Sequence, residues 1–130
     1  IGRYMANLVA DKYGFSENGD FTYDRKPIPK TIEMSLEEHS ELIKQNKLYG
    51  KIICRCESVT EGEIVDAINR PLGATTVDGI KRRVRASAGR CQGGFCLPHL
   101  MEILARELGE DMSDVVKNSK ESYYVDGRVK

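Results

Sequence analysis

The sequence has no tryptophan, no excess of charge of either sign and no long hydrophobic run. Its 20 basic residues balance 20 acidic ones, so the overall charge does not indicate a nucleic acid or an anionic membrane as partner. No apolar run approaches the roughly 18 residues that a membrane-spanning helix needs, and no signal-peptide pattern opens the chain. With 40% hydrophobic and 31% charged residues among 130, the composition indicates one soluble globular domain, or one small domain with ordered arms.

Only four cysteines are present, in two close pairs: Cys54 with Cys56, and Cys91 with Cys96. Simple burial in a core would place them on helix faces, and the tight pairing argues against it. Disulfide scaffolds belong to small secreted proteins that have more cysteines for their length. The pattern therefore predicts a metal site in a reducing cytoplasm.

Three metal centres suit four thiolates: a [2Fe–2S] cluster, a [4Fe–4S] cluster or a zinc ion. Structural zinc prefers cysteines separated by about two to four residues, so the Cys-x-Cys spacing of the first pair is unusual for zinc. The second pair is at the edge of that range, and neither spacing matches the common ferredoxin patterns. The spacing favours an iron–sulfur cluster over zinc but does not decide among the three metal centres.

Five helices are expected, because capping residues or a first-turn proline precede apolar side chains at helical spacing. They begin, in chain order, at Ile1, Ser35, Thr60, Thr76 and Pro98. The first ends at Gly14, the second near Lys47 and the last at Gly109. The remaining pattern predicts an extended segment at 51–56, with a further turn and a short edge strand within 113–125.

The compact part is expected at 51–109, where three helices flank the two cysteine loops. Its predicted core consists of six aliphatic side chains: Ile64, Ile68, Ile80, Val84, Leu100 and Leu104. A unit of this size buries little apolar surface and usually needs a staple, which a metal centre supplies. The expected fold class is mainly α: a small, helix-turn-helix-like, metal-stapled domain with an extended N-terminal arm.

Residues beside the cysteines could tune a bound metal. In an extended segment, Cys54 and Cys56 would face one side and Arg55 the other. Most of the basic side chains between 81 and 90 are expected on a solvated helix face. Arg55 and Arg90 differ from them because each adjoins a cysteine, and nearby cations favour a reduced, more negative cluster.

Other polar residues have simpler explanations. His99 follows Cys96 by three residues and could be a Rieske-like or zinc ligand, but four cysteines already complete a site, so it is expected at the surface or half-buried. His39 is expected to be structural. Capping explains Glu63, and no carboxylate is expected to face another across a cleft. DNA binding through a basic second helix is disfavoured by the neutral overall charge.

Segments 53–57, 60–64 and 78–96, the last ending in Arg-Cys-Gln-Gly-Gly-Phe-Cys, resemble the bacterioferritin-associated-ferredoxin-like (BFD-like) [2Fe–2S] domain. The form most similar in pattern ends FAD-dependent glycerol-3-phosphate dehydrogenases of the anaerobic type. The founding small ferredoxins close the second pair as Cys-x2-Cys, whereas this sequence has Cys-x4-Cys, as in the dehydrogenase branch. Residues 86–89 read Ala-Ser-Ala-Gly in place of the Ala-Gly-Met-Gly common there.

The resemblance implies that the cluster ligands are Cys54, Cys56, Cys91 and Cys96, and that four neighbours surround the cofactor: Arg55, Arg90, Gly93 and Gly94. The glycines would let backbone N–H groups approach the sulfurs. It further implies a division of the chain into the last helix of a flavin domain, a linker, the cluster domain and a tail, at 1–14, 15–50, 51–109 and 110–130. Because the chain opens on Ile1, we expect that flavin domain to lie upstream.

The implied function is electron transfer, from FAD in the missing domain to an acceptor protein or a membrane-associated subunit. The flavin domain of the same chain is the expected partner, nucleic acid is not, and the fragment by itself is expected to catalyse nothing. A cytoplasmic location is expected, at the inner face of the membrane through a partner. The alternative is a zinc-bound structural or docking domain without a redox role.

Overall fold

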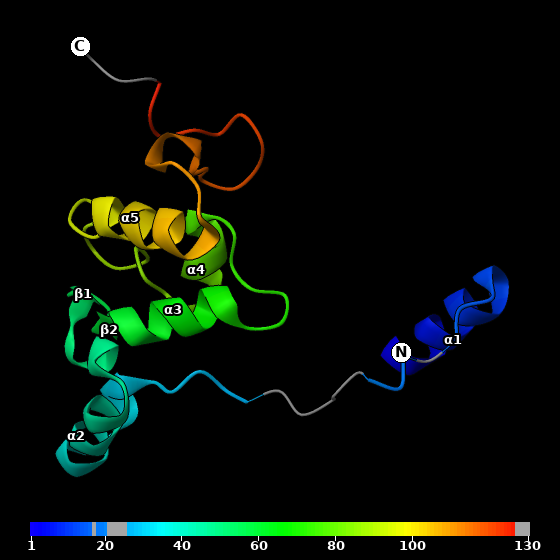
Figure 1. Cartoon of the computed structure of the whole chain (residues 1–130), viewed down its shortest axis with the longest axis horizontal. Coiled ribbons are helices and arrows are strands. Elements are labelled where there is room, and N and C mark those ends of the chain that lie inside the picture. Colours follow the sequence, from blue (N-terminus) through cyan, green and yellow to red (C-terminus); the bar gives the residue numbers. More distant parts are fainter. Residues whose placement is uncertain (17, 21–25, 127–130) are drawn as a thin grey trace.

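A computed structural model describes residues 1–16, 18–20 and 26–126, and the chain is mainly helical, as expected (Figure 1). The helices of this part are α1 (Gly2–Tyr13), α2 (Leu36–Gln45), α3 (Glu61–Asn69), α4 (Val77–Val84) and α5 (Leu97–Leu108). The strands are β1 (Ile52–Cys54) and β2 (Val59–Thr60), and short 3-10 helices are η1 (Thr31–Glu33), η2 (Lys47–Gly50) and η3 (Met112–Asp114). None of the described helices combines the length and apolarity that crossing a membrane requires.

Side-chain caps begin three of these helices, as the sequence predicts. Ser35 and Glu38 form a reciprocal capping box before α2, and Thr60 and Glu63 form one before α3. The Thr76 hydroxyl accepts a hydrogen bond from the Gly79 N–H at 3.0 Å and starts α4. Each such cap stabilises its helix by about 1 kcal/mol, because it satisfies a backbone donor that the helix leaves free.

The core lies where α3, α4 and α5 meet, and Figure 1 shows α3 and α5 one above the other with α4 beside both. Five of the six predicted core residues are buried, and Val84 packs against them from a half-buried position. Two cysteines, Cys54 and Cys96, belong to the same buried cluster, each about 1% exposed. The core therefore extends directly to the cysteine loops.

The strands β1 and β2 form an antiparallel hairpin in which Ile52 pairs with Thr60. The prediction of one extended segment over 51–56 was wrong at its end. The strand stops at Cys54, and residues 55–58 turn, with Ser58 at a φ of 53°. As a result Cys54 is buried whereas Cys56 is exposed, and the two do not share one side of a strand.

The segments before residue 51 differ in whether they contact the core. The helix expected at the start is confirmed as α1, which ends at Gly14 with a φ of 68° and has no buried residue. Residues upstream of β1 contact α3, since Tyr49 is buried and the Thr31 hydroxyl donates to Glu63 at 3.0 Å. Parts of the predicted linker and tail (17, 21–25 and 127–130) lie outside the described residues, and the division into domains stays a prediction.

The segment after α5 folds back onto α4. The Asp78 N–H donates to the Lys117 carbonyl at 2.9 Å, and an isolated antiparallel bridge joins Val116 to Tyr123. The further turn expected here is η3, and the short edge strand is reduced to this bridge. The predicted stop of α5 at Gly109 is confirmed, with a φ of 70°.

Candidate metal centre

The two cysteine segments meet in space, and each cysteine lies near a cysteine of the other segment. Cys56 Sγ lies 3.5 Å from Cys91 Sγ, and we call these two residues the outer pair. Cys54 contributes to the raised pKa of the Cys96 thiol, so these two buried cysteines lie near each other and form the inner pair. Each pair thus takes one cysteine from the β1 end and one from the loop before α5. All four thiols are free of disulfides, and Cys91 also interacts electrostatically with Cys96.

The arrangement as two pairs bears on the kind of metal that could fit. A single tetrahedral zinc ion with Zn–S bonds near 2.3 Å would hold every two of four sulfurs about 3.8 Å apart. Within residues 1–16, 18–20 and 26–126, no group of three or more Cys, His, Asp or Glu is placed to hold one metal ion. Two pairs of thiols fit a binuclear centre, in which each of two irons takes two cysteine sulfurs.

A glycine makes the approach of the two loops possible. A Cβ atom built on Gly89 would lie 2.4 Å from the Cys56 Cβ, which is closer than two carbons can come. The loop from Arg85 to Cys96 turns repeatedly, and Ser87 and Gln92 adopt positive φ angles of 68° and 48°. The Gln92 side chain ties the loop by donating to the Gly89 carbonyl at 2.8 Å. Residue 89 was singled out only as part of a variant stretch, since sequence gives no sign of the contact with Cys56.

The two cysteines of the second segment differ in their surroundings. The backbone N–H groups of Phe95, Gly93 and Gly94 face the Cys91 sulfur, and with the Cys56 thiol they lower the pKa of the Cys91 thiol. Burial raises the pKa of the Cys96 thiol to about 11, with a further contribution from Cys54. The structure therefore places the two predicted glycines beside Cys91.

The two arginines singled out from the sequence are exposed. Neither Arg55 nor Arg90 has a hydrogen bond or ion pair with any residue that the structure describes, and their tuning role stays a prediction. A third arginine, Arg85, pairs with Glu57 at 2.8 Å, next to Cys56. This ion pair was not predicted, because Arg85 sits in a basic run that reads as solvated surface.

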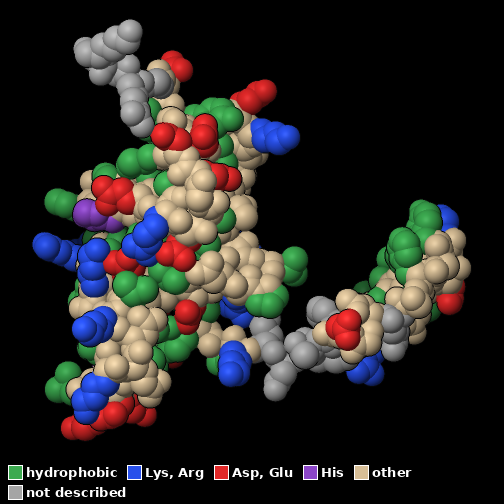
Figure 2. Space-filling model, viewed as in Figure 1, with side chains coloured by type: hydrophobic (Ala, Val, Ile, Leu, Met, Phe, Trp, Pro, Cys, Tyr) green, Lys and Arg blue, Asp and Glu red, His purple; other side chains and the backbone are tan. Residues whose placement is uncertain are grey.

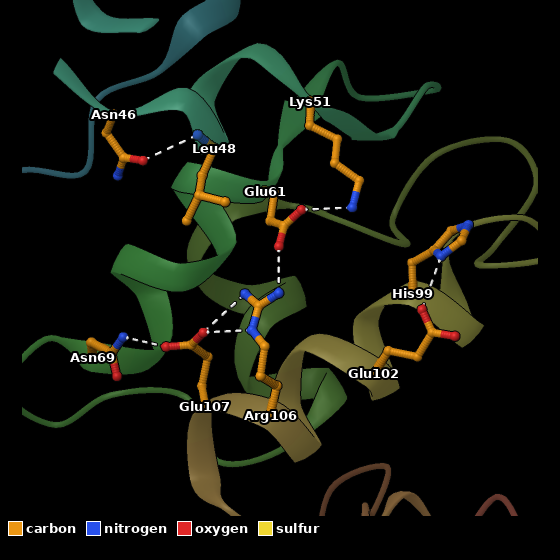
Figure 3. A network of polar contacts seen from close by, with 9 residues as sticks. All are labelled: Asn46, Leu48, Lys51, Glu61, Asn69, His99, Glu102, Arg106 and Glu107. Atoms are coloured by element: carbon orange, nitrogen blue, oxygen red, sulfur yellow. Dashed lines mark hydrogen bonds and ion pairs between the residues drawn. The ribbon is translucent and has the colours of Figure 1, made fainter. Parts of the chain in front are cut away.

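The remaining polar candidates have structural partners. His99 is exposed, and its Nδ1 lies 3.3 Å from Glu102 Oε2, a contact that is drawn as a dashed line in Figure 3. His39 Nε2 lies 2.9 Å from the Tyr49 carbonyl oxygen. Their expected surface and structural positions are confirmed. Asp66 accepts a hydrogen bond from the Tyr49 hydroxyl, and Glu63 completes a capping box.

Glu61 is a buried carboxylate whose partners the sequence did not indicate. It is 2% exposed and lies between Lys51 Nζ at 2.8 Å and Arg106 Nη1 at 2.7 Å (Figure 3). Burial alone would raise the pKa of Glu61, but the hydrogen bonds and charges of these two cations hold it below the usual value. Arg106 lies in α5, too far along the chain for spacing to reveal the contact.

Comparison with known proteins agrees with this geometry. Residues 52–106 match the BFD-like [2Fe-2S] binding domain. The whole chain is 57% identical to 27% of the glycerol 3-phosphate dehydrogenase of Caloramator mitchellensis. It is 30% identical, over 66% of its length, to 14% of subunit A1 of the anaerobic glycerol-3-phosphate dehydrogenase of Haloferax volcanii. It is 41% identical, over 45% of its length, to 12% of the hydrogen cyanide synthase subunit HcnB of Pseudomonas aeruginosa.

The chain thus spans about a quarter of the length of the first of these relatives and less of the other two. No solved structure is significantly similar to it. The matched segment contains all four cysteines, both pairs of sulfurs and the helices that carry the core. Through residues 52–106, the chain belongs to the family of BFD-like [2Fe–2S] binding domains.

Proposed function

We propose that this chain is the electron-transfer module of an FAD-dependent glycerol-3-phosphate dehydrogenase. The observation that carries the proposal is the grouping of four thiols into two pairs, which suits two irons that each take two cysteine sulfurs. In this proposal the inner pair, Cys54 and Cys96, holds one iron, and the outer pair, Cys56 and Cys91, holds the other. The bound cluster supplies one-electron chemistry, which neither the helices nor the side chains around it could provide.

The protein around the cysteines has three tasks. The apolar core closes off the inner pair from water, since Cys54 and Cys96 are each about 1% exposed and belong to the buried cluster. The amides of Gly93, Gly94 and Phe95 orient and stabilise the thiolate of Cys91. Gly89 allows the two loops to meet.

Similarity beyond the family segment supports the choice of parent enzyme. The relative named glycerol 3-phosphate dehydrogenase matches all of the chain, including the residues before β1, whereas the hydrogen cyanide synthase subunit matches 45% of it. In the parent, this domain would accept electrons from reduced FAD in the flavin domain of the same protein. It would pass them singly to an acceptor protein or membrane-associated subunit, at the cytoplasmic side of the membrane.

The proposal is tested on the chain purified and reconstituted with iron and sulfide under anaerobic conditions. We expect a brown protein with two irons and two sulfides per chain, whose visible absorbance decreases on addition of dithionite and whose reduced form gives an electron paramagnetic resonance signal. Replacing the ligand Cys91→Ser should remove most of this absorbance, while the matched surface change His99→Ala should not. A colourless protein with one tightly bound zinc would support the docking-domain alternative and contradict the proposal.

The parent reaction is tested in the intact dehydrogenase. Glycerol 3-phosphate should reduce its flavin in both the unchanged enzyme and the Cys91→Ser variant, because the substrate step lies upstream of the cluster. Turnover with the natural acceptor should be lost only in the variant. Unchanged turnover in a variant that lacks the cluster would exclude the relay.

A further inference from the structure

The two sulfur pairs lie in different environments. Both cysteines of the inner pair are about 1% exposed, and they pack among aliphatic side chains of the core. In the outer pair, Cys56 is exposed and Cys91 is half-buried, and the neighbouring Phe95 side chain is 80% exposed. Negative charge added at the outer pair is therefore solvated, whereas the same charge at the inner pair is surrounded by apolar atoms.

Backbone amides add to this difference. Three N–H groups face the Cys91 sulfur, but that of Gly94 already donates to the Cys91 carbonyl oxygen at 2.9 Å, which leaves those of Phe95 and Gly93; the Ser87 amide faces the Cys96 sulfur. Hydrogen bonds to a ligand sulfur favour the more negative state of an iron centre. The larger set of donors lies on the outer pair.

Side-chain charges favour the same side. Arg90 directly precedes Cys91, and within the part of the chain that the structure describes it has no anionic partner. Figure 2 shows Lys and Arg side chains along the edge of the molecule that β1 and the first turn of α5 occupy in Figure 1, but Cys54 and Cys96 also adjoin these elements, so this broader charge favours neither pair. Glu57 follows Cys56 and would oppose added negative charge, but Arg85 neutralises it at 2.8 Å.

One feature favours the inner pair, namely the N-terminus of α5, which begins directly after Cys96. A helix N-terminus stabilises negative charge mainly through its free first-turn N–H groups. Here the Leu97 N–H donates to the Gly93 carbonyl at 2.9 Å, and Pro98 has no N–H. Two of the first-turn N–H donors are therefore absent or already used. The solvent, amides and cations at the outer pair stabilise added negative charge more than this helix N-terminus does at the inner pair.

We propose that Cys56 and Cys91 hold the iron that accepts the electron, while Cys54 and Cys96 hold the iron that stays ferric. On reduction one ferric ion becomes ferrous, with one electron supplied by reduced flavin in the parent or by dithionite in the test, and no bond is made or broken. Electrons then enter and leave through the exposed edge beside Phe95. The inference rests on the proposed [2Fe–2S] function.

The experiment is proton nuclear magnetic resonance of the dithionite-reduced protein, with one cysteine variant used only to assign signals. In a reduced, spin-coupled iron pair, the β-protons of cysteines on the ferrous ion differ from those on the ferric ion in shift and in temperature dependence. Gly89 lies against the Cβ of Cys56, so a strong nuclear Overhauser effect from a Gly89 α-proton identifies the Cys56 signals. In a Cys54→Ser chain that still carries the cluster, the loss of one set of β-proton signals identifies Cys54, a member of the inner pair.

We expect Cys56 and Cys91 to show the ferrous behaviour and Cys54 and Cys96 the ferric one. Ferrous behaviour at the inner pair, or equal sharing between the two pairs, would overturn the inference and leave the proposed function intact. A reconstituted protein that forms no reducible [2Fe–2S] centre would overturn both. The spectrum reports where the electron lies and does not depend on enzymatic activity.

Discussion

Gly89 lies directly against Cys56: a Cβ on residue 89 would come within 2.4 Å of the Cys56 Cβ and 3.2 Å of Glu57 Oε1. The two loops that carry the outer pair therefore approach each other as closely as the backbone permits. The contact joins the turn after β1 to the loop before α5, which are held by different parts of the core. It makes a glycine at this position a requirement of the site.

The first prediction follows from this contact. Gly89→Ala should push the loops apart, lower the iron content after reconstitution and destabilise the loaded protein by about 1–3 kcal/mol, the usual cost of overpacking. Iron analysis and urea unfolding measure the two effects. Gly2→Ala is the matched control, because a Cβ there meets nothing within 4 Å and should leave both quantities unchanged. Full iron content in Gly89→Ala would mean that the loops separate without harm to the site.

The second prediction concerns the buried carboxylate. Glu61→Gln replaces a carboxylate oxygen between Lys51 and Arg106 with an NH2 group, a donor that faces a cation. Breaking a buried ion pair costs about 3–5 kcal/mol, but the side chains of both cations are at least half exposed, so solvent screening reduces the expected loss to about 1–3 kcal/mol. The exposed Glu102→Gln is the control and should change the free energy of unfolding by less than about 0.5 kcal/mol.

The same carboxylate gives the stability a pH dependence. The pKa of Glu61 is lowered in the folded chain, so its contribution is present above the pKa of the unfolded chain and is lost as pH falls through the lower, folded pKa. Unfolding free energies should therefore converge for the unchanged chain and Glu61→Gln in acid. A constant difference between them down to pH 2 would contradict the ion-pair account.

Local signals in the sequence predicted much of the fold. The capping pairs Ser35–Glu38 and Thr60–Glu63, and the left-handed Gly109, act within one turn of a helix, so residue type and spacing suffice to place them. The helical spacing of apolar residues within each helix likewise identified core residues such as Ile64, Ile80 and Leu104. These features depend on neighbours in the chain, which the sequence shows directly.

The rest depends on contacts between distant segments. The four cysteines were recognisable, but the exchange of partners between Cys54–Cys96 and Cys56–Cys91 follows from the hairpin turn after β1, which spacing did not reveal. The ion pair between Arg85 and Glu57 is of the same kind. Residue types can nominate ligands, whereas the fold decides which of them meet.

The third prediction is that removing the cluster should weaken the whole core. Cys54 and Cys96 are members of the buried apolar cluster, so binding energy at the site is part of the folding energy. Stripping the reconstituted protein with a chelator and reductant should lower the melting temperature by at least about 4–8 °C, which corresponds to about 1 kcal/mol in a domain of this size. Equal melting temperatures of the loaded and stripped chains would contradict this coupling.

The fourth prediction concerns Arg90. Arg90→Glu replaces a cation next to Cys91 with an anion, so the reduced and more negative state should be less favourable and the reduction potential should fall. Slower turnover with the natural acceptor should follow in the intact enzyme, while reduction of flavin by substrate stays unchanged. Potentiometric titration measures the effect, and it should shrink in high salt because Arg90 is exposed. Arg3→Glu in α1 is the control, and an unchanged potential in Arg90→Glu would remove the tuning role.

The fifth prediction separates the backbone of Phe95 from its ring. Phe95→Pro removes the N–H that faces the Cys91 sulfur, whereas Phe95→Ala keeps it and deletes a ring that is 80% exposed. The donor stabilises negative charge on that sulfur, so the proline variant should have the lower reduction potential while the alanine variant stays close to the unchanged chain. The two variants must first show equal iron content and the same visible spectrum, so that a lost site is not mistaken for a shifted one. Equal potentials in the two variants, both loaded, would mean that the amide of Phe95 does not act on the cluster. In that case only solvent and Arg90 would stabilise the added negative charge at the outer pair.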